Sequence, residues 1–102
     1  MPEIIDQDAY YRQQIENLQL VTEHLKKILS DREKLIIKLA YGYDMDNATE
    51  TGERRLNDKE ISKLGLPGID LTKARIKELR EEAMGKVKIV AQRIRSGTIN
   101  NE

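Results

Sequence analysis

Two short motifs constrain the fold of this chain most, because each marks the start of a helix. In Ser30-Asp31-Arg32-Glu33, the serine hydroxyl can bond the backbone amide of Glu33 while the Glu33 side chain reaches back, which is the capping-box arrangement. Asn57-Asp58-Lys59-Glu60 repeats that arrangement, and apolar residues follow both motifs. Gly42 and Gly65 come next and can take the left-handed conformation that closes a helix. We therefore expect helices over residues 31–41 and 58–64.

Apolar spacing predicts two further helices. The first stripe alternates steps of four and three and consists of Tyr11, Ile15, Leu18, Thr22, Leu25 and Leu29, widened by Val21 and Ile28. It predicts an amphipathic helix over residues 8–29. The second stripe consists of Ile76, Leu79, Ala83, Val87, Val90 and Ile94, and Asp70 or Thr72 can cap that helix. Residues 43–56 between these helices are polar and lack periodicity, so they predict a long loop.

The composition favours an all-α fold of four to five helices, since 35% of the residues are charged and Trp and Phe are absent. We expect an amphipathic helix in residues 1–30, a helical domain over 31–95 and a flexible tail over 96–102. Without cysteine and with His24 as the only histidine, no zinc site or other metal site is expected. No motif provides a nucleophile with its base or a phosphate-cradling loop, so neither an enzyme nor a cofactor is predicted.

No apolar run approaches the ~20 residues that span a bilayer, and no basic segment followed by an apolar stretch opens the chain. A cytoplasmic protein is therefore expected.

Charge is distributed unevenly although the formal net charge is zero. Residues 1–70 contain 10 Lys and Arg against 14 Asp and Glu, a net charge of −4. Residues 71–95 contain eight Lys and Arg against three Glu, a net charge of +5. A polyanion would be attracted to this last segment.

A short capped helix, a turn containing Gly68 and a longer basic helix together predict a helix-turn-helix. Ile76 and Leu79 are expected to face the core. The polar residues expected on the solvent side, within reach of phosphates or base edges, are Lys73, Arg75, Lys77, Glu78 and Arg80. An ordinary helical hairpin with a solvated basic helix fits this pattern equally well.

Three ordered segments resemble the C-terminal promoter-binding domain, region 4, of the sigma-70 family. The first is Leu29-Ser30-Asp31-Arg32-Glu33 with Tyr41-Gly42-Tyr43-Asp44-Met45 after it, and the second is Leu56-Asn57-Asp58-Lys59-Glu60-Ile61. The third, residues 72–87, is similar to the recognition helix of that family. The resemblance implies a subunit that binds the flap of the RNA polymerase beta subunit and contacts the upstream (minus-35) promoter element.

The resemblance also implies roles for individual residues. Lys73, Lys77 and Glu78 would approach base edges, and the wider set of DNA contacts would add Thr72, Arg75, Arg80, Lys59 and Arg55. The flap contacts would come from Leu35, Ile36, Leu39, Ile61 and Leu64, which are expected to serve the core first.

The sequence departs from the family pattern at Ala74, where a glutamate is common, and in enlarged loops at residues 46–56 and 66–71. The preceding regions that bind the minus-10 element are absent, so a second sigma subunit is an expected partner. Small subunits of split sigma factors in bacteriophage late transcription fit that description.

Two other interpretations remain open. A polymerase-binding coactivator or anti-sigma-like mimic would share the fold without reading DNA. A dimeric regulator would use the first helix as its dimer seam and would read paired half-sites.

Overall fold

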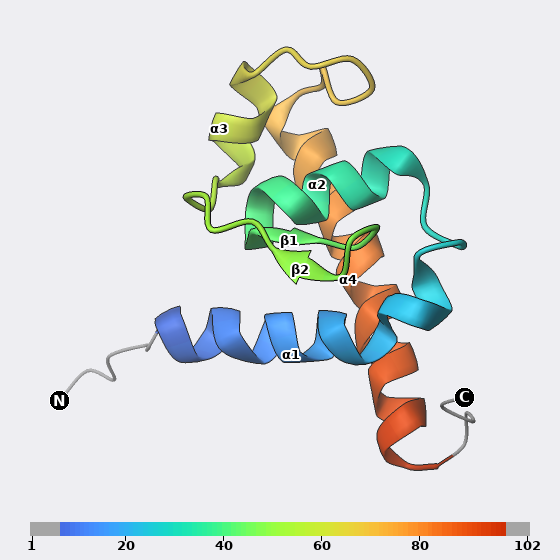
Figure 1. The fold of residues 1–102 in the computed structure, drawn as a ribbon. Helices are drawn as coiled ribbons and strands as arrows, with labels where there is room; N and C mark the ends of the chain where they lie inside the picture. Colours follow the sequence, from blue (N-terminus) through green and yellow to red (C-terminus); the bar gives the residue numbers. More distant parts are fainter. Residues whose placement is uncertain (1–6, 98–102) are drawn as a thin grey trace, which may run out of the picture.

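The computed structural model describes residues 7–97, most of which are helical (Figure 1). The elements in chain order are α1 (Gln7–Leu25), α2 (Asp31–Tyr41), β1 (Tyr43–Asp44), β2 (Thr49–Glu50), α3 (Asp58–Lys63) and α4 (Lys73–Arg95). The four helices agree with the predicted all-α class, and the small two-stranded sheet is an addition to it. Residues 1–6 of the predicted N-terminal region and residues 98–102 of the predicted tail lie outside the described residues.

Side-chain caps define the starts of α2, α3 and α4. Ser30 Oγ accepts from the Glu33 amide at 3.1 Å, while Glu33 Oε1 accepts from the Ser30 amide at 3.0 Å. The Asn57 side chain accepts from the Glu60 amide at 2.8 Å and completes a second capping box. Both predicted capping boxes are confirmed. Of the two residues predicted to cap α4, Thr72 does so, through its hydroxyl and the Arg75 amide at 3.2 Å.

One hydrophobic core joins all four helices. α4 runs through the molecule, and α1, α2 and α3 all pack against it, with the small sheet between α1 and α2 (Figure 1). The side chains of Leu18 and Val21 from α1, Ile36 and Ile37 from α2, and Val87 from α4 are fully buried in this core. The apolar face of α1 is therefore covered by the rest of the chain.

Residues 43–50 differ from the predicted loop. They form a hairpin in which Tyr43 pairs with Glu50 and Asp44 with Thr49. The Tyr43 side chain is buried, and its hydroxyl lies 2.9 Å from Thr22 Oγ1. Because Thr22 already donates to the Leu18 carbonyl at 2.6 Å, the tyrosine hydroxyl is the donor in this contact. Strands of two residues are too short to show an alternating pattern, so the sequence pattern could not predict them.

The apolar stripes are confirmed with local corrections. α1 ends at Leu25 rather than at residue 29, and a turn over residues 26–28 follows it. That turn leaves Ile28 66% exposed, so its predicted place in the stripe is wrong. In α4, Ala91 is fully buried whereas Val90 is only partly buried, which shifts the predicted stripe by one residue near its end.

Candidate nucleic-acid interface

A two-point ion pair holds α3 against α4. Arg80 Nε donates to Asp58 Oδ1 at 2.8 Å, and Arg80 Nη2 donates to Asp58 Oδ2 at 3.0 Å. The third guanidinium nitrogen, Nη1, donates to the Tyr41 hydroxyl at 3.3 Å. The hydrogen bonds from Arg80 to Asp58 raise the pKa of Arg80 above its already high ordinary value. This planar, two-point pairing fixes the orientation of the guanidinium as well as its position.

The prediction that Arg80 lies on the solvent side is therefore wrong. Its side chain is 24% exposed, and that of Asp58 is 13% exposed. Asp58 comes from α3 and Tyr41 comes from the end of α2, so Arg80 holds three helices together. It serves the scaffold of the predicted interface and not its surface.

The first turns of α4 separate apolar from polar residues as predicted. Ile76 and Leu79 are buried, and the remaining residues predicted to contact DNA here, Thr72, Lys73, Arg75, Lys77 and Glu78, are exposed. Lys59 on α3 is exposed as well. The first turns of α4 thus present a polar face next to the α3 surface.

The cations on this face are not equally available. Arg75 Nη1 lies 3.4 Å from Glu78 Oε2, an exposed pair one helical turn apart. Lys73 and Lys77 form no ion pair with any residue between 7 and 97. These two lysines are the readily available positive charges at the start of α4.

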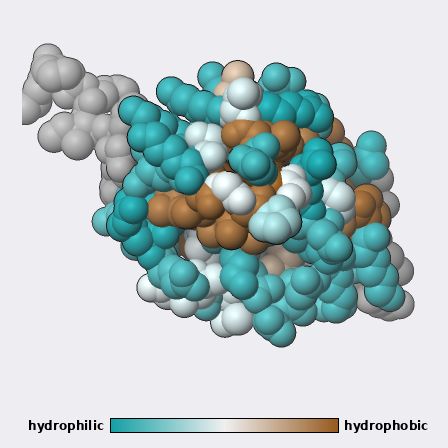
Figure 2. Space-filling model, turned by 90° about the horizontal axis from the view of Figure 1, so that it is seen from above, coloured by the Kyte–Doolittle hydropathy of each residue, from teal (hydrophilic) through white to brown (hydrophobic). Residues whose placement is uncertain are grey.

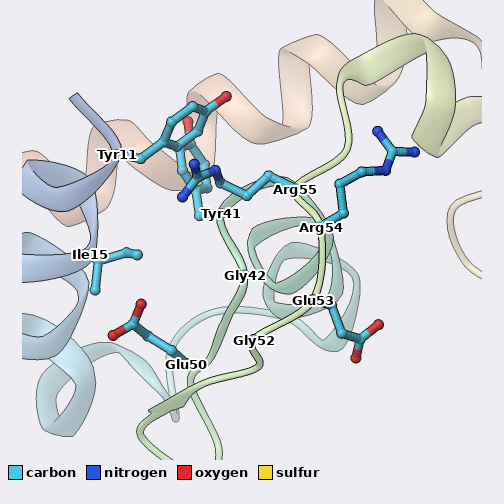
Figure 3. A pocket seen from close by; sticks show the side chains of 9 residues that line it. All are labelled: Tyr11, Ile15, Tyr41, Gly42, Glu50, Gly52, Glu53, Arg54 and Arg55. Atoms are coloured by element: carbon cyan, nitrogen blue, oxygen red, sulfur yellow. The ribbon is translucent and has the colours of Figure 1, made fainter. Parts of the chain in front are cut away.

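Arg55 lies away from this face and against α1. Its guanidinium carbon is 4.0 Å from the centre of the Tyr11 ring, and its Nη2 is 3.7 Å from Asp8 Oδ1. Figure 3 shows Arg55 beside Tyr11 and Tyr41, at the edge of a pocket of about 500 Å³. Arg55 therefore connects the segment before α3 to α1, a role that its predicted phosphate contact did not include.

The charged side chains that line the pocket favour neither an anionic nor a cationic ligand. Glu50 and Glu53 line it together with Arg54 and Arg55, so its acidic and basic side chains are equal in number. Arg54 is further engaged by Glu60, at 2.7 Å.

A cluster of tyrosines that was not predicted links α1 to Arg80. The Tyr10 and Tyr11 ring centroids are 5.3 Å apart, and those of Tyr11 and Tyr41 are 5.9 Å apart. Burial raises the pKa of Tyr41 to about 12, although its hydrogen bond with Arg80 acts in the opposite direction. Tyr41 stays protonated at neutral pH and contacts α1 and α4 at the same time. The one sequence signal for this cluster is that all four aromatic residues of the chain are tyrosines.

The residues predicted to bind the polymerase flap divide into two groups. Ile36 and Ile61 are fully buried in the core, so neither offers a surface to a partner, and that part of the prediction is wrong. Leu35 and Leu39 are partly buried, and Leu64 is 45% exposed. Figure 2 looks down on the end of the molecule where α3 and the following turn lie, and it shows apolar atoms surrounded by polar ones.

Within residues 7–97, no group of three or more His, Cys, Asp or Glu side chains is placed to hold a metal ion. None of the helices in that range is both long and apolar enough to cross a membrane.

No family model matches the sequence, and no match was found among curated proteins or among solved structures.

Proposed function

We propose that this chain is a subunit of a transcription initiation factor that binds the RNA polymerase beta flap and contacts the upstream promoter element. In this proposal α3, the turn over residues 64–72 and α4 form a helix-turn-helix resembling sigma region 4. The observation that carries the proposal is the Asp58–Arg80 pair, which holds α3 on α4 while the first turns of α4 remain exposed. A recognition helix needs such a rigid support, because base contacts depend on its docking angle.

The chemistry of the first turns of α4 suits a DNA groove. Lys73 and Lys77 would supply donors to guanine or to phosphates, and Glu78 would accept from the amino group of cytosine. Arg75 can exchange its exposed partner Glu78 for a phosphate at little cost, since such surface pairs contribute only about 0–1 kcal/mol. Thr72 and Lys59 lie at the margin, where phosphate contacts would fix the register.

The polymerase contact would use the accessible apolar residues. Leu35 and Leu39 lie on one face of α2, and Leu64 and Leu66 are exposed after α3. Accessible apolar side chains with polar neighbours suit a protein-binding surface. A second sigma subunit carrying the minus-10-binding region would complete the factor in the host cytoplasm, as in bacteriophage late transcription.

One observation favours the alternative, a polymerase-binding coactivator or mimic that does not read DNA. Between residues 73 and 82, four basic residues stand against three glutamates, and Asp58 on α3 neutralises Arg80. The start of α4 therefore has almost no net charge to attract DNA over a distance.

The experiment that tests the proposal measures promoter DNA and polymerase binding separately. Lys73→Ala and Lys77→Ala should each weaken promoter binding by about 1–3 kcal/mol while binding to core polymerase stays intact. Lys27→Ala removes an equally exposed lysine from the segment after α1 and serves as the control. Unchanged promoter affinity in both variants, with polymerase still bound, would establish the mimic instead. If the wild-type chain binds neither core polymerase nor the isolated flap, both the initiation-factor subunit and the mimic are excluded.

A further inference from the structure

The net positive charge of α4 is concentrated in its second half. Residues 83–97 contain Lys86, Lys88, Arg93 and Arg95 and no acidic residue. Of these four cations, only Lys86 forms an ion pair with a described residue, Glu33, at 3.0 Å. Lys88, Arg93 and Arg95 are exposed and form no ion pair with any described residue. The segment with the strongest attraction for an anion is thus not the one that begins the helix.

Two of these cations continue a line that starts at the N-terminal end of α4. At 3.6 residues per turn, Lys73, Lys77, Lys88 and Arg95 fall within about 60° of one another around the helix. All four are exposed, and we call them the lysine–arginine stripe. Glu81 borders the stripe near its middle, so it consists of a proximal pair, Lys73 and Lys77, and a distal pair, Lys88 and Arg95.

The separation of the two pairs suits the width of a DNA groove. Lys77 and Lys88 are 11 positions apart, which is about 16 Å along a helix that rises 1.5 Å per residue. The major groove of B-DNA is about 12 Å wide. A helix that places Lys77 inside the groove therefore brings Lys88 past its edge, where the phosphates lie. Figure 1 shows that the last turns of α4 continue beyond α1, and both residues of the distal pair are exposed.

The favourable interaction of cations with a helix C-terminus does not account for the whole stripe. That interaction is confined to the last turn, so it includes Arg95 and excludes Lys88.

Gly85 is a second feature that the chain itself does not explain. A glycine within a helix costs about 1 kcal/mol relative to alanine. An added Cβ at Gly85 would meet no atom within 4 Å, so no packing inside the protein requires the glycine. Glycine at such a position permits close approach of another backbone, and Gly85 is partly exposed and lies one turn before the exposed Lys88.

We propose that the distal pair, Lys88 and Arg95, binds the phosphate backbone of duplex DNA beside the groove that the first turns of α4 enter. This inference rests on the proposed DNA-binding function and adds a sequence-independent contact to it. The distal pair supplies the attraction that the nearly neutral start of α4 lacks, and the proximal pair supplies the base contacts.

The test measures how DNA affinity of the full chain depends on salt, with a mixed-sequence duplex about three helical turns long as the probe. Each phosphate contact contributes about 0.9 to the slope of log K against log salt concentration. The double variant Lys88→Ala/Arg95→Ala should therefore have a slope shallower by about 1.8. The control is Lys27→Ala/Arg93→Ala, which removes the same charge from two exposed residues outside the stripe.

Each outcome gives a decision. A shallower slope in the stripe variant and an unchanged slope in the control support the inference. Equal changes in both variants, or no change in the stripe variant, would overturn it and leave the proposed function standing if Lys73→Ala/Lys77→Ala still weakens binding. Absence of any salt-dependent DNA binding by the wild-type chain would overturn both. If Lys88→Ala alone made the slope as shallow as the double variant does, Arg95 would contact no phosphate. That result would contradict the paired form proposed here.

Discussion

Arg80 and Asp58 join α4 to α3 through two hydrogen bonds of 2.8 and 3.0 Å, and both side chains are largely shielded from solvent. A bidentate arginine–carboxylate pair of this kind restrains rotation between the two helices, which a single hydrogen bond would allow. The same guanidinium donates to Tyr41, so the end of α2 is tied to the same point. One side chain therefore links all three helices, in addition to the apolar core that they share.

Arg80→Ala is expected to destabilise the fold, because it leaves the Asp58 carboxylate shielded and unpaired. Breaking a fully buried pair costs about 3–5 kcal/mol, and the partial exposure of this pair reduces our expectation to about 2 kcal/mol. Urea unfolding would measure the loss, and the cycle of Arg80→Ala, Asp58→Ala and the double variant would isolate the coupling. Additive effects in that cycle would show that the pair does not act as a unit.

Local signals account for the part of the fold that the sequence predicted well. Ser30 with Glu33, and Asn57 with Glu60, are neighbours in the chain, so their capping geometry is written within four residues. Arg80 is different, because its partners lie far away in sequence, on α3 and on α2. The helical wheel gives the direction of Arg80 relative to the core but not the helix that lies there, and this is why the pairing of Arg80 with Asp58 was not predicted.

The capping residue of α2 offers a direct test of the local part. Ser30→Ala should cost about 1 kcal/mol of stability, since the Glu33 amide then loses its acceptor. Ser30→Asp keeps an acceptor and should stay within a few tenths of a kcal/mol of the wild type. Thermal or urea unfolding distinguishes the two. Equal destabilisation by alanine and aspartate would mean that Ser30 acts through something other than its cap.

The acid dependence of stability should carry a contribution from Glu33. Burial opposes its charge, but hydrogen bonds from the Ser30 backbone and from Lys86 outweigh burial and lower its pKa below the ordinary 4.5. A lowered pKa in the folded state means that the charged form is stabilised by folding. This contribution is fully present above pH 4.5 and disappears as the pH falls through the folded-state pKa.

Unfolding of the wild type and of Glu33→Gln across this pH range would measure that contribution. The difference in the free energy of unfolding between them should be largest at neutral pH and shrink below pH 4.5. Lys86→Met, which removes one of the stabilising partners, should reduce the pH dependence without abolishing it. A difference that stays constant with pH would contradict the assignment to the Glu33 carboxylate.

Gly42 should be hard to replace, because its backbone has a φ of 70° and its amide closes α2 on the Lys38 carbonyl. An added Cβ would meet Thr51 Oγ1 at 3.5 Å, an ordinary contact, so strain rather than a clash sets the cost. Gly42→Ala should therefore lose about 1–2 kcal/mol, and Gly42→Asn should lose less because asparagine tolerates this conformation better. Equal losses measured by urea unfolding would indicate a steric cause instead.

A last experiment tests whether Arg55 stabilises the fold or contacts DNA. The sequence placed it among the phosphate contacts, whereas the structure has it over the Tyr11 ring with Asp8 nearby. Arg55→Ala should therefore lower stability by about 0.5–1 kcal/mol, as expected for an exposed cation–π contact. Tyr11→Leu should abolish the same contact, so the two losses should not add in the double variant.

The salt dependence of DNA binding should be the same in Arg55→Ala as in the wild type, since the Arg55 guanidinium contacts α1. If the slope of log K against log salt concentration became shallower by about 0.9, Arg55 would contact a phosphate and α1 would lie beside the DNA.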